Sequence, residues 1–294
     1  MQAALSSGDV DSLGRMYENF YRDPCSKGLV ATPRSWVGAS DREYIDDAEL
    51  RVMLQQTQYR IECWRSYTSG RYPIAALESP GVGRPFGVWV EETFIVPRAE
   101  YHHASAVRTA ALAGADSTIV EIGGGHGAMA YHLLRAANRI RYIDFDLPET
   151  LALAAYYLAH ALPQHDLVLC GEEGGSLEES PAGSITLLPP WKMPCLADKS
   201  AGVTFSSHLL CDLAPAARER YLVEIGRFTT GCLVDWGRED PDALKEFERH
   251  FELVERRRAA WHLYRDPDAR ECELLLRPRD QPSTNRASCS SPVR

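Results

Sequence analysis

From residue 117 onward, short apolar runs alternate with longer segments of helical periodicity. The run "STIVEI" at 117–122 is rich in β-branched residues and predicts a strand. The segment "AMAYHLLRAAN" that follows it predicts a helix, with apolar positions at Met129, Leu133 and Leu134. A parallel sheet with helices on both faces is therefore expected. The same alternation predicts further strands at 140–146, 165–171, 201–207 and 231–237, and further helices at 147–162, 215–228 and 241–251.

Two strand-like runs near the end of the chain break this alternation. They are "AAWHLYRD" at 259–266 and "ECELLLR" at 271–277, and only the residues "PDAR" separate them. Such a connection is too short for a parallel crossover, so the pair must form an antiparallel hairpin. The predicted fold is α/β and Rossmann-like, with a seven-stranded, mostly parallel sheet that ends in an antiparallel hairpin.

The first 115 residues have a different character. Much of this region has helical periodicity, and the segment "GRPFGVWVEETFIVP" at 83–97 is apolar and interrupted by Gly and Pro. We expect residues 1–115 to form a mainly helical N-terminal cap that contributes to substrate binding. Residues 116–278 are expected to form the cofactor-binding domain. Residues 279–294 are rich in Ser, Pro and Arg and are expected to be a disordered tail.

Composition and charge restrict the classes of function. The net charge of -9 argues against a nucleic-acid partner, which would require a basic face. No run of about 18 apolar residues predicts a membrane span, and the N-terminus lacks the pattern of a secretory signal. The eight cysteines are scattered without a CxxC pair, which is typical of free thiols in a reducing cytoplasm. No His-x-x-His motif or Asp-rich loop predicts a metal site.

The sequence "VEIGGGHGAMA" joins the first predicted strand to its helix through a glycine-rich turn. At such a turn the backbone can approach a ligand, and the helix N-terminus offers free N–H groups. Two registers are open. Gly123, Gly125 and Ala128 fit the dinucleotide motif G-x-G-x-x-G/A. The same first two glycines with Gly127, preceded by Glu121, fit the motif that binds S-adenosylmethionine.

Three observations favour the second register. Glu121 stands two residues before the first glycine, where a carboxylate can hold the ammonium group of an amino acid. The motif begins after roughly 115 residues of mostly helical sequence, which is late for a dinucleotide domain. The sheet is also expected to end in a hairpin, as methyltransferase sheets do. We therefore expect S-adenosyl-L-methionine as the cofactor and S-adenosyl-L-homocysteine as its product.

The second predicted strand ends in "YIDFDLPET". A carboxylate at this position can bind both hydroxyls of a ribose. Asp146 lies 19 residues after Gly127 and directly precedes the helix, so it is the first candidate. Asp144 has the same side-chain parity on the strand and is the alternative. Leu147, next to Asp146, is expected to contact the cofactor as well.

An adenine ring needs an apolar slot and one polar contact. Before the fourth predicted strand, "ITLLPPW" offers Leu187, Leu188 and Trp191 for the slot, and Glu172 could supply the polar contact. Buried leucine and tryptophan are more often plain core residues, and of these residues we retain Leu188 as the cofactor candidate. Ser206, at the end of the fourth strand, completes the predicted cofactor contacts.

Taken together, these segments resemble the sugar O-methyltransferase family of class I methyltransferases, over roughly residues 83–237. The resemblance is carried by "VEIGGGHGAMAYHLL", "YIDFDLPETLALAAYYL", "ITLLPPW" and "GVTFSSHLLCDLAPAARERYL". It implies the class I methyltransferase fold, S-adenosylmethionine as donor and a sugar or sugar-like hydroxyl as acceptor. The Asp-Leu-Pro segment is also similar to that of small-molecule O-methyltransferases, whose aspartate there holds the ribose, which supports Asp146.

Methyl transfer to an unactivated alcohol requires alignment of the oxygen and removal of its proton. The base should lie at the carboxyl edge of the sheet, after the fourth predicted strand, which ends in "FSSHLLCD". His208 is the first candidate because imidazole titrates near neutrality, and Asp212 is the next. The family segment usually reads Ser-Phe-x-Glu-Met, whereas this chain has Ser-His-Leu-Leu at 207–210, so the acid of the family is missing.

Three other histidines are candidates for the site. His126 lies inside the glycine loop, and His102 and His103 lie in "AEYHHAS" of the N-terminal region. Adjacent residues face different ways on a helix, so at most one of this pair can point into the site. We retain His103 as the third catalytic candidate, with His102 and His126 as alternatives.

The sequence thus predicts a cytoplasmic, S-adenosylmethionine-dependent O-methyltransferase that acts on a small-molecule glycoside or sugar nucleotide, in natural-product or surface-glycan assembly. No nucleic-acid or membrane partner is expected, and a homodimer is compatible with the prediction. One alternative is an NAD-dependent oxidoreductase that uses the dinucleotide register. The other is a methyltransferase-like binding module without turnover, which the missing acid after the fourth strand suggests.

Overall fold

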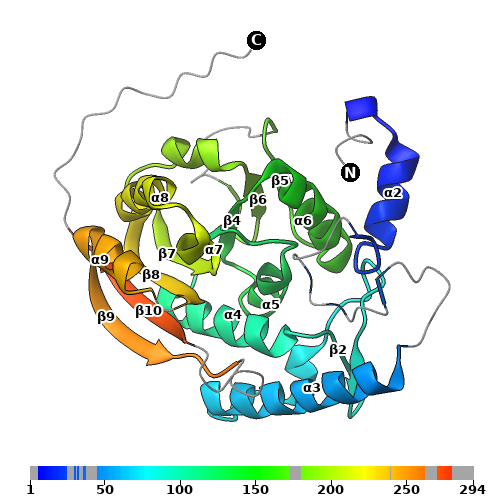
Figure 1. Cartoon of the computed structure of the whole chain (residues 1–294). Coiled ribbons are helices and arrows are strands. Elements are labelled where there is room, and N and C mark those ends of the chain that lie inside the picture. Colours follow the sequence, from blue (N-terminus) through cyan, green and yellow to red (C-terminus); the bar gives the residue numbers. More distant parts are fainter. Residues whose placement is uncertain are drawn as a thin grey trace.

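The computed structural model describes residues 6–24, 30, 32, 36–37, 45–172, 180–238, 240–261 and 270–279. Its centre is an eight-stranded sheet with the order β5-β6-β4-β3-β7-β8-β10-β9 (Figure 1). The predicted tail at 279–294 lies outside these residues, except for Arg279. The strands are β3 (Thr118–Ile122), β4 (Arg141–Phe145), β5 (Leu167–Leu169), β6 (Ile185–Leu188), β7 (Ala201–Ser207), β8 (Thr229–Arg238), β9 (Phe251–Arg258) and β10 (Glu271–Pro278).

The sheet is parallel from β5 to β8 and antiparallel beyond. Each neighbouring pair from β5 to β8 is parallel, whereas β10 is antiparallel to both β8 and β9. All five residues of β3 are buried, as expected for a central parallel strand that is covered on both faces. The strand order also reverses direction at β3, which has β4 on one side and β7 on the other.

Helices cover both faces of the sheet (Figure 1). Successive side chains of a strand point to opposite faces, so Ile119 and Phe205 join the core under α4, α5 and α6, whereas Val120 and Ile122 join the core under α8 and α9. The helices are α4 (Ala99–Ala113), α5 (Ala128–Ala136), α6 (Pro148–Ala161), α7 (Leu209–Asp212), α8 (Pro215–Phe228), α9 (Pro241–His250) and the 3-10 helix η4 (Pro190–Cys195).

The N-terminal region packs onto the first of these two faces. Its elements are α2 (Val10–Glu18), α3 (Asp47–Tyr67), the 3-10 helix η2 (Ile74–Leu77) and the two-stranded hairpin β1 (Val88–Val90) and β2 (Thr93–Ile95). Helix α3 runs alongside α4, where the Nε1–H of Trp64 donates to Nδ1 of His103 at 3.0 Å (Figure 1). The Tyr59 hydroxyl donates to the carbonyl of Ala260 at 2.8 Å, which ties α3 to the chain after β9. The region therefore shares a core with the sheet.

Three details of the predicted fold were wrong. The sheet has eight strands rather than seven, because "ITLL" forms β6 beside β4 instead of an open slot. The first hairpin strand is Phe251–Arg258 rather than 259–266, of which residues 262–266 lie outside the described residues. Burial alternates along β9 with a period of two, as expected for a strand, but residues 252–258 were assigned to no element in the prediction. The hairpin β1–β2 was not predicted at all.

The class of fold is confirmed by the topology. A mostly parallel sheet that is closed by an antiparallel pair, with helices on both faces, is the methyltransferase-like α/β fold. The predicted boundary near residue 115 falls in the short connection between α4 and β3. Among the helices that the structure describes, none has the length and apolar character needed to cross a membrane.

Candidate active site

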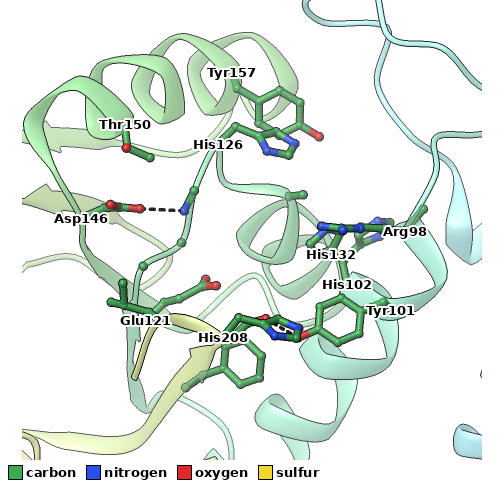
Figure 2. A pocket seen from close by; sticks show the side chains of 18 of the residues that line it. Arg98, Tyr101, His102, Glu121, His126, His132, Asp146, Thr150, Tyr157 and His208 are labelled. Atoms are coloured by element: carbon green, nitrogen blue, oxygen red, sulfur yellow. Dashed lines mark hydrogen bonds between the residues drawn. The ribbon is translucent and has the colours of Figure 1, made fainter. Parts of the chain in front are cut away.

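A cavity of about 580 Å³ lies where β3, β4 and β7 end, between these strand ends and α4 (Figure 2). Ligands of open α/β sheets bind outside the carboxyl ends of the strands, at the point where the strand order reverses. That point is β3 in this sheet. The volume is in the range of sites for small molecules and cofactors. The cavity is therefore the candidate active site.

The glycine loop after β3 forms one wall and is held by two aspartates. The N–H of Gly124 donates to Oδ1 of Asp144 at 3.0 Å, and the N–H of Gly125 donates to Oδ2 of Asp146 at 2.9 Å. Gly125 has a φ of +61°, a left-handed conformation that side chains rarely adopt. Gly123 and Gly125 line the cavity, as predicted for a loop that approaches a ligand.

Gly127 has a different position from the one we predicted for it. It does not line the cavity but precedes α5 with a φ of +89°. A Cβ atom at Gly127 would lie 2.9 Å from the side chain of Leu158. This glycine therefore allows the loop to pack against α6 and does not itself line the cavity.

Three carboxyl groups gather beneath and beside the loop. Glu121 lines the cavity and accepts a hydrogen bond from the Tyr142 hydroxyl at 2.5 Å. Burial raises the pKa of Glu121 to about 7. The hydrogen bond from Tyr142 lowers this pKa, and the negative charge of Asp146 raises it. Burial also raises the pKa of Asp144 far above its usual range, and Glu121 and Asp146 raise it further. A ligand cation would relieve this repulsion.

The aspartate within β4, Asp144, and the one directly after it, Asp146, have different surroundings. Asp146 lines the cavity and accepts a second bond from the N–H of Leu147 at 2.6 Å, and its pKa is raised by burial. Asp144 is 1% exposed, lies under the loop and is not part of the cavity wall. Of the two candidates, Asp146 is the one that a ligand can reach. Leu147 also lines the cavity, with 60% of its surface exposed.

Helix α4 supplies the opposite wall through Arg98, Tyr101 and His102 (Figure 2). His103, the residue that we retained, is turned away from the cavity, is 4% exposed and accepts the hydrogen bond from Trp64. Adjacent residues diverge by about 100° on a helix, so the inward position of His102 excludes the same position for His103. Burial, followed by the nearby histidines and Arg98, holds the pKa of His102 well below its usual range.

The histidine of the glycine loop contacts the N-terminal region. His126 lines the cavity, and its Nε2 is 3.0 Å from the hydroxyl of Tyr21. Its ring also packs against Tyr157 of α6 with the centroids 5.1 Å apart. Burial and Arg98 lower its pKa to about 4, so it is neutral at ordinary pH. His126 therefore joins the segment after α2 to the loop.

The end of β7 brings Phe205, Ser207 and His208 to the cavity. The hydroxyl groups of Ser207 and Tyr101 are hydrogen-bonded across it. Ser206, which we predicted to touch the cofactor, is fully buried and absent from the wall. Side chains alternate along a strand, so the inward positions of its two neighbours turn Ser206 to the other face. Ser207 takes its place as the serine that a ligand can reach.

His208 and Asp212, the first two candidates for the general base, both line the cavity. His208 has a left-handed backbone with a φ of +64° and begins the short helix α7, and Asp212 ends that helix. The predicted adenine slot is not formed by "ITLLPPW". Leu187 and Leu188 are buried in the two hydrophobic cores, and Trp191 and Glu172 do not line the cavity.

Arg98, Tyr101 and Tyr21 line the cavity but were not predicted from the sequence, and His102 was named only as an alternative to His103. Arg98, Tyr101 and His102 have the spacing i, i+3 and i+4, which places them on one face of a helix. That spacing could have identified α4 as a wall. No local signal points to Tyr21, which reaches the loop from 105 positions away. Among the residues that the structure describes, no group of three or more His, Cys, Asp or Glu side chains is arranged to hold a metal ion.

Comparisons with known proteins give only distant similarities. No family model and no curated protein matches the chain. The mitomycin 7-O-methyltransferase MmcR is 15% identical over 61% of this chain and 53% of its own, with a TM-score of 0.43. The pyocyanin biosynthetic protein PhzM is 14% identical over 62% and 56%, with a TM-score of 0.42. The TehB-like SAM-dependent methyltransferase of Corynebacterium glutamicum is 15% identical over 77% and 99%, with a TM-score of 0.43. The chain spans about half the length of MmcR and PhzM, and similarity at these TM-scores is too low to assign a function.

The contact between Gly124 and Asp144 should be sensitive to a single methyl group. A Cβ atom at Gly124 would lie 2.7 to 2.8 Å from the carboxyl group of Asp144, which is buried and cannot move into solvent. We expect Gly124→Ala to lower the free energy of unfolding by about 1 to 3 kcal/mol, measured by urea denaturation.

Gly81→Ala is the matched control, because a Cβ atom there meets nothing within 4 Å. It should leave the stability nearly unchanged. If the clash with Asp144 causes the loss, Gly124→Ala should cost less in a chain that also carries Asp144→Ala. Equal costs in both backgrounds would contradict the proposed contact.

Proposed function

We propose that the protein is an S-adenosylmethionine-dependent methyltransferase that methylates a hydroxyl of a sugar or sugar-like small molecule. The observation that carries the proposal is the group of three carboxyl residues, Glu121, Asp144 and Asp146, around the glycine loop. Burial raises the pKa of each, and repulsion from neighbouring carboxylates adds to the effect at Glu121 and Asp144. Such a site favours a cation, and S-adenosylmethionine carries a sulfonium and an ammonium group.

The residues of the cavity fit the parts of this cofactor. Asp146 already accepts bonds from the N–H groups of Gly125 and Leu147, but each carboxylate oxygen has two acceptor positions, so ribose hydroxyls can still donate to it. Glu121 reaches the cavity and would pair with the ammonium group. Leu147 offers exposed apolar surface beside Asp146 for the adenine ring.

The same carboxyl groups argue against the oxidoreductase alternative. In a dinucleotide site the pyrophosphate lies against the N–H groups of the glycine loop. Here the N–H groups of Gly124 and Gly125 are bonded to aspartate side chains. A pyrophosphate would have to displace these bonds and approach buried negative charge, which is unfavourable.

His208 is our proposed general base. S-adenosylmethionine supplies a methyl group on a positively charged sulfur, so the task left to the protein is to orient the acceptor and accept its hydroxyl proton. A base is most effective when its pKa is near the working pH. Burial places the pKa of His102 and His126 far below that range, which makes them weak proton acceptors. His208 lies at the carboxyl end of β7, and Asp212 on the same helix is its nearest acidic candidate in sequence.

The choice of cofactor can be tested by calorimetry. We expect S-adenosylhomocysteine to bind and NAD to show no binding. Asp146→Asn should weaken the binding of S-adenosylhomocysteine by about tenfold or more, because it replaces a carboxylate that accepts several bonds. Asp47→Asn, at the exposed start of α3, is the control and should bind like the wild type. Binding of NAD without S-adenosylhomocysteine would contradict the proposal.

The affinity for S-adenosylhomocysteine should depend on pH through Glu121. Its raised pKa of about 7 means that the free protein holds a proton there in mildly acidic solution, and an ammonium group must displace it. We therefore expect the affinity to rise from about pH 5.5 to about pH 7.5, by at most about tenfold per pH unit.

Two controls isolate this effect. Glu121→Gln should bind more weakly and with a flatter pH profile. The ligand 5′-methylthioadenosine lacks the amino-acid group, so its affinity for the wild type should also vary little. An equally steep profile for Glu121→Gln would show that Glu121 does not titrate on binding.

The role of His208 can be tested with labelled S-adenosylmethionine and a panel of glycosides and sugar nucleotides. His208→Asn should lower the rate of methyl transfer by about 10² to 10⁴, while the affinity for S-adenosylhomocysteine stays unchanged. His160→Asn, on the exposed side of α6, is the control. If His208→Asn keeps the full rate and His102→Asn loses it, the base is His102.

A further inference from the structure

Charged side chains line the cavity from more than one side (Figure 2). Glu121 and Asp146 lie on the side of the glycine loop, and Arg98, His102 and His132 lie on the opposite side. Of the described residues that line the cavity, Arg98 is the single Arg or Lys, whereas four residues are Asp or Glu.

The backbone holds Arg98 in an unusual conformation. Its φ is +78°, in the left-handed region, and it directly precedes α4 as the N-cap residue without a side-chain cap bond. Such a conformation is unfavourable for a residue with a Cβ atom. Among the described non-glycine residues with positive φ, Arg98 and His208 are the two that line the cavity. The chain therefore carries two strained positions, and both project into the site.

The residues around Arg98 leave it as the one fixed positive charge of this wall. Burial keeps the pKa of His102, His126 and His132 low, and the charge of Arg98 contributes at His102 and His126. These imidazoles are neutral and can exchange hydrogen bonds with hydroxyl groups. Nδ1 of His132 is buried and has no hydrogen-bond partner in the described structure. The side of Arg98 thus combines one cation with the neutral rings of His102 and His132.

We propose that the acceptor carries an anionic group, a carboxylate or a phosphate, and that Arg98 binds this group. The inference rests on the proposed function, because it takes the side of Glu121 and Asp146 to be the cofactor side. Guanidinium binds both anions through paired N–H donors, and the neutral imidazoles would bind the hydroxyls of a sugar. Glu121 and Asp146 would repel an anion from the side of the glycine loop, which favours its binding at Arg98.

Three sugar probes that differ in charge can test this proposal. They are glucose 1-phosphate, glucuronate and methyl glucoside, titrated into the protein with and without S-adenosylhomocysteine by calorimetry. We expect one or both anionic sugars to bind about tenfold or more tightly than methyl glucoside. Which of the two binds better distinguishes a phosphate from a carboxylate acceptor.

Variants at Arg98 show whether the preference arises there. Arg98→Gln should abolish the difference between charged and neutral sugars, and Arg98→Lys should retain part of it, because lysine keeps the charge without the paired donors. Arg51→Gln, on the exposed face of α3, is the control and should keep the full preference. Thermal unfolding of each variant verifies that it is folded.

The proposal is overturned if methyl glucoside binds as tightly as the anionic sugars, if no anionic sugar binds, or if Arg98→Gln keeps the preference. These outcomes are separate from the test of the cofactor. Binding of S-adenosylhomocysteine without any anion preference would refute the role of Arg98 alone. An anion preference that depends on Arg98 in a protein that binds no S-adenosylhomocysteine would refute the proposed function instead.

Discussion

The site depends on two hydrogen bonds between the glycine loop and the end of β4. Asp144 and Asp146 accept the N–H groups of Gly124 and Gly125, which fixes the path of the loop between β3 and α5. Asp144 can lie there only because Gly124 has no side chain. Burial raises the pKa of all three carboxyl groups, and repulsion from neighbouring carboxylates raises those of Glu121 and Asp144 further. The hydrogen bonds that hold the loop thus require carboxyl groups to be buried close together, which is unfavourable. A cationic ligand can offset this cost.

The second requirement is the N-terminal region, without which the cavity would be an open edge of the sheet. Tyr101 of α4 is hydrogen-bonded to Ser207 at the end of β7, and Tyr21 meets His126 in the glycine loop. Helix α4 is in turn fixed from behind by Trp64 of α3 through His103. His103 therefore supports the wall on which His102 lies, and the two adjacent histidines have complementary tasks. A change in the N-terminal region can alter the site without touching the cofactor loop.

Much of the fold was predictable because its signals are local. Apart from β6, η4 and α7, the elements from β3 to α9 follow strand and helix periodicity, and the predicted bounds of β7 and α8 coincide with the observed ones. The acids next to the glycines were also identified from their spacing, and Asp146 and Glu121 do line the cavity. The class of fold and the position of the loop therefore follow from short segments of sequence.

The other wall was less predictable because it depends on orientation and on distant contacts. Periodicity places His102 and His103 on one helix but does not show which of them faces the cavity. For the same reason, the sequence did not show that Ser207 rather than Ser206 faces the cavity at the end of β7. Leu188 was assigned to a ligand slot because a short apolar run looks alike in a core strand and in a pocket. Tyr21 depends on the packing of α2 near α6, which no local pattern contains.

The opposite charges of Arg98 and of the carboxyl groups near the glycine loop would couple the binding of an acceptor to the binding of a donor. Before a cofactor binds, an anion that approaches Arg98 also meets the field of the carboxyl groups near the glycine loop. A cationic donor neutralises that field, so an anionic acceptor would bind more readily after the donor than before it. Coupling between two sites is reciprocal, and the acceptor would strengthen the binding of the donor by the same factor. Removal of the methyl group leaves a donor product without the sulfonium charge, and the attraction between the two halves then weakens. A cavity with this distribution of charge would favour the ternary complex with the reactive donor over the complex with its product.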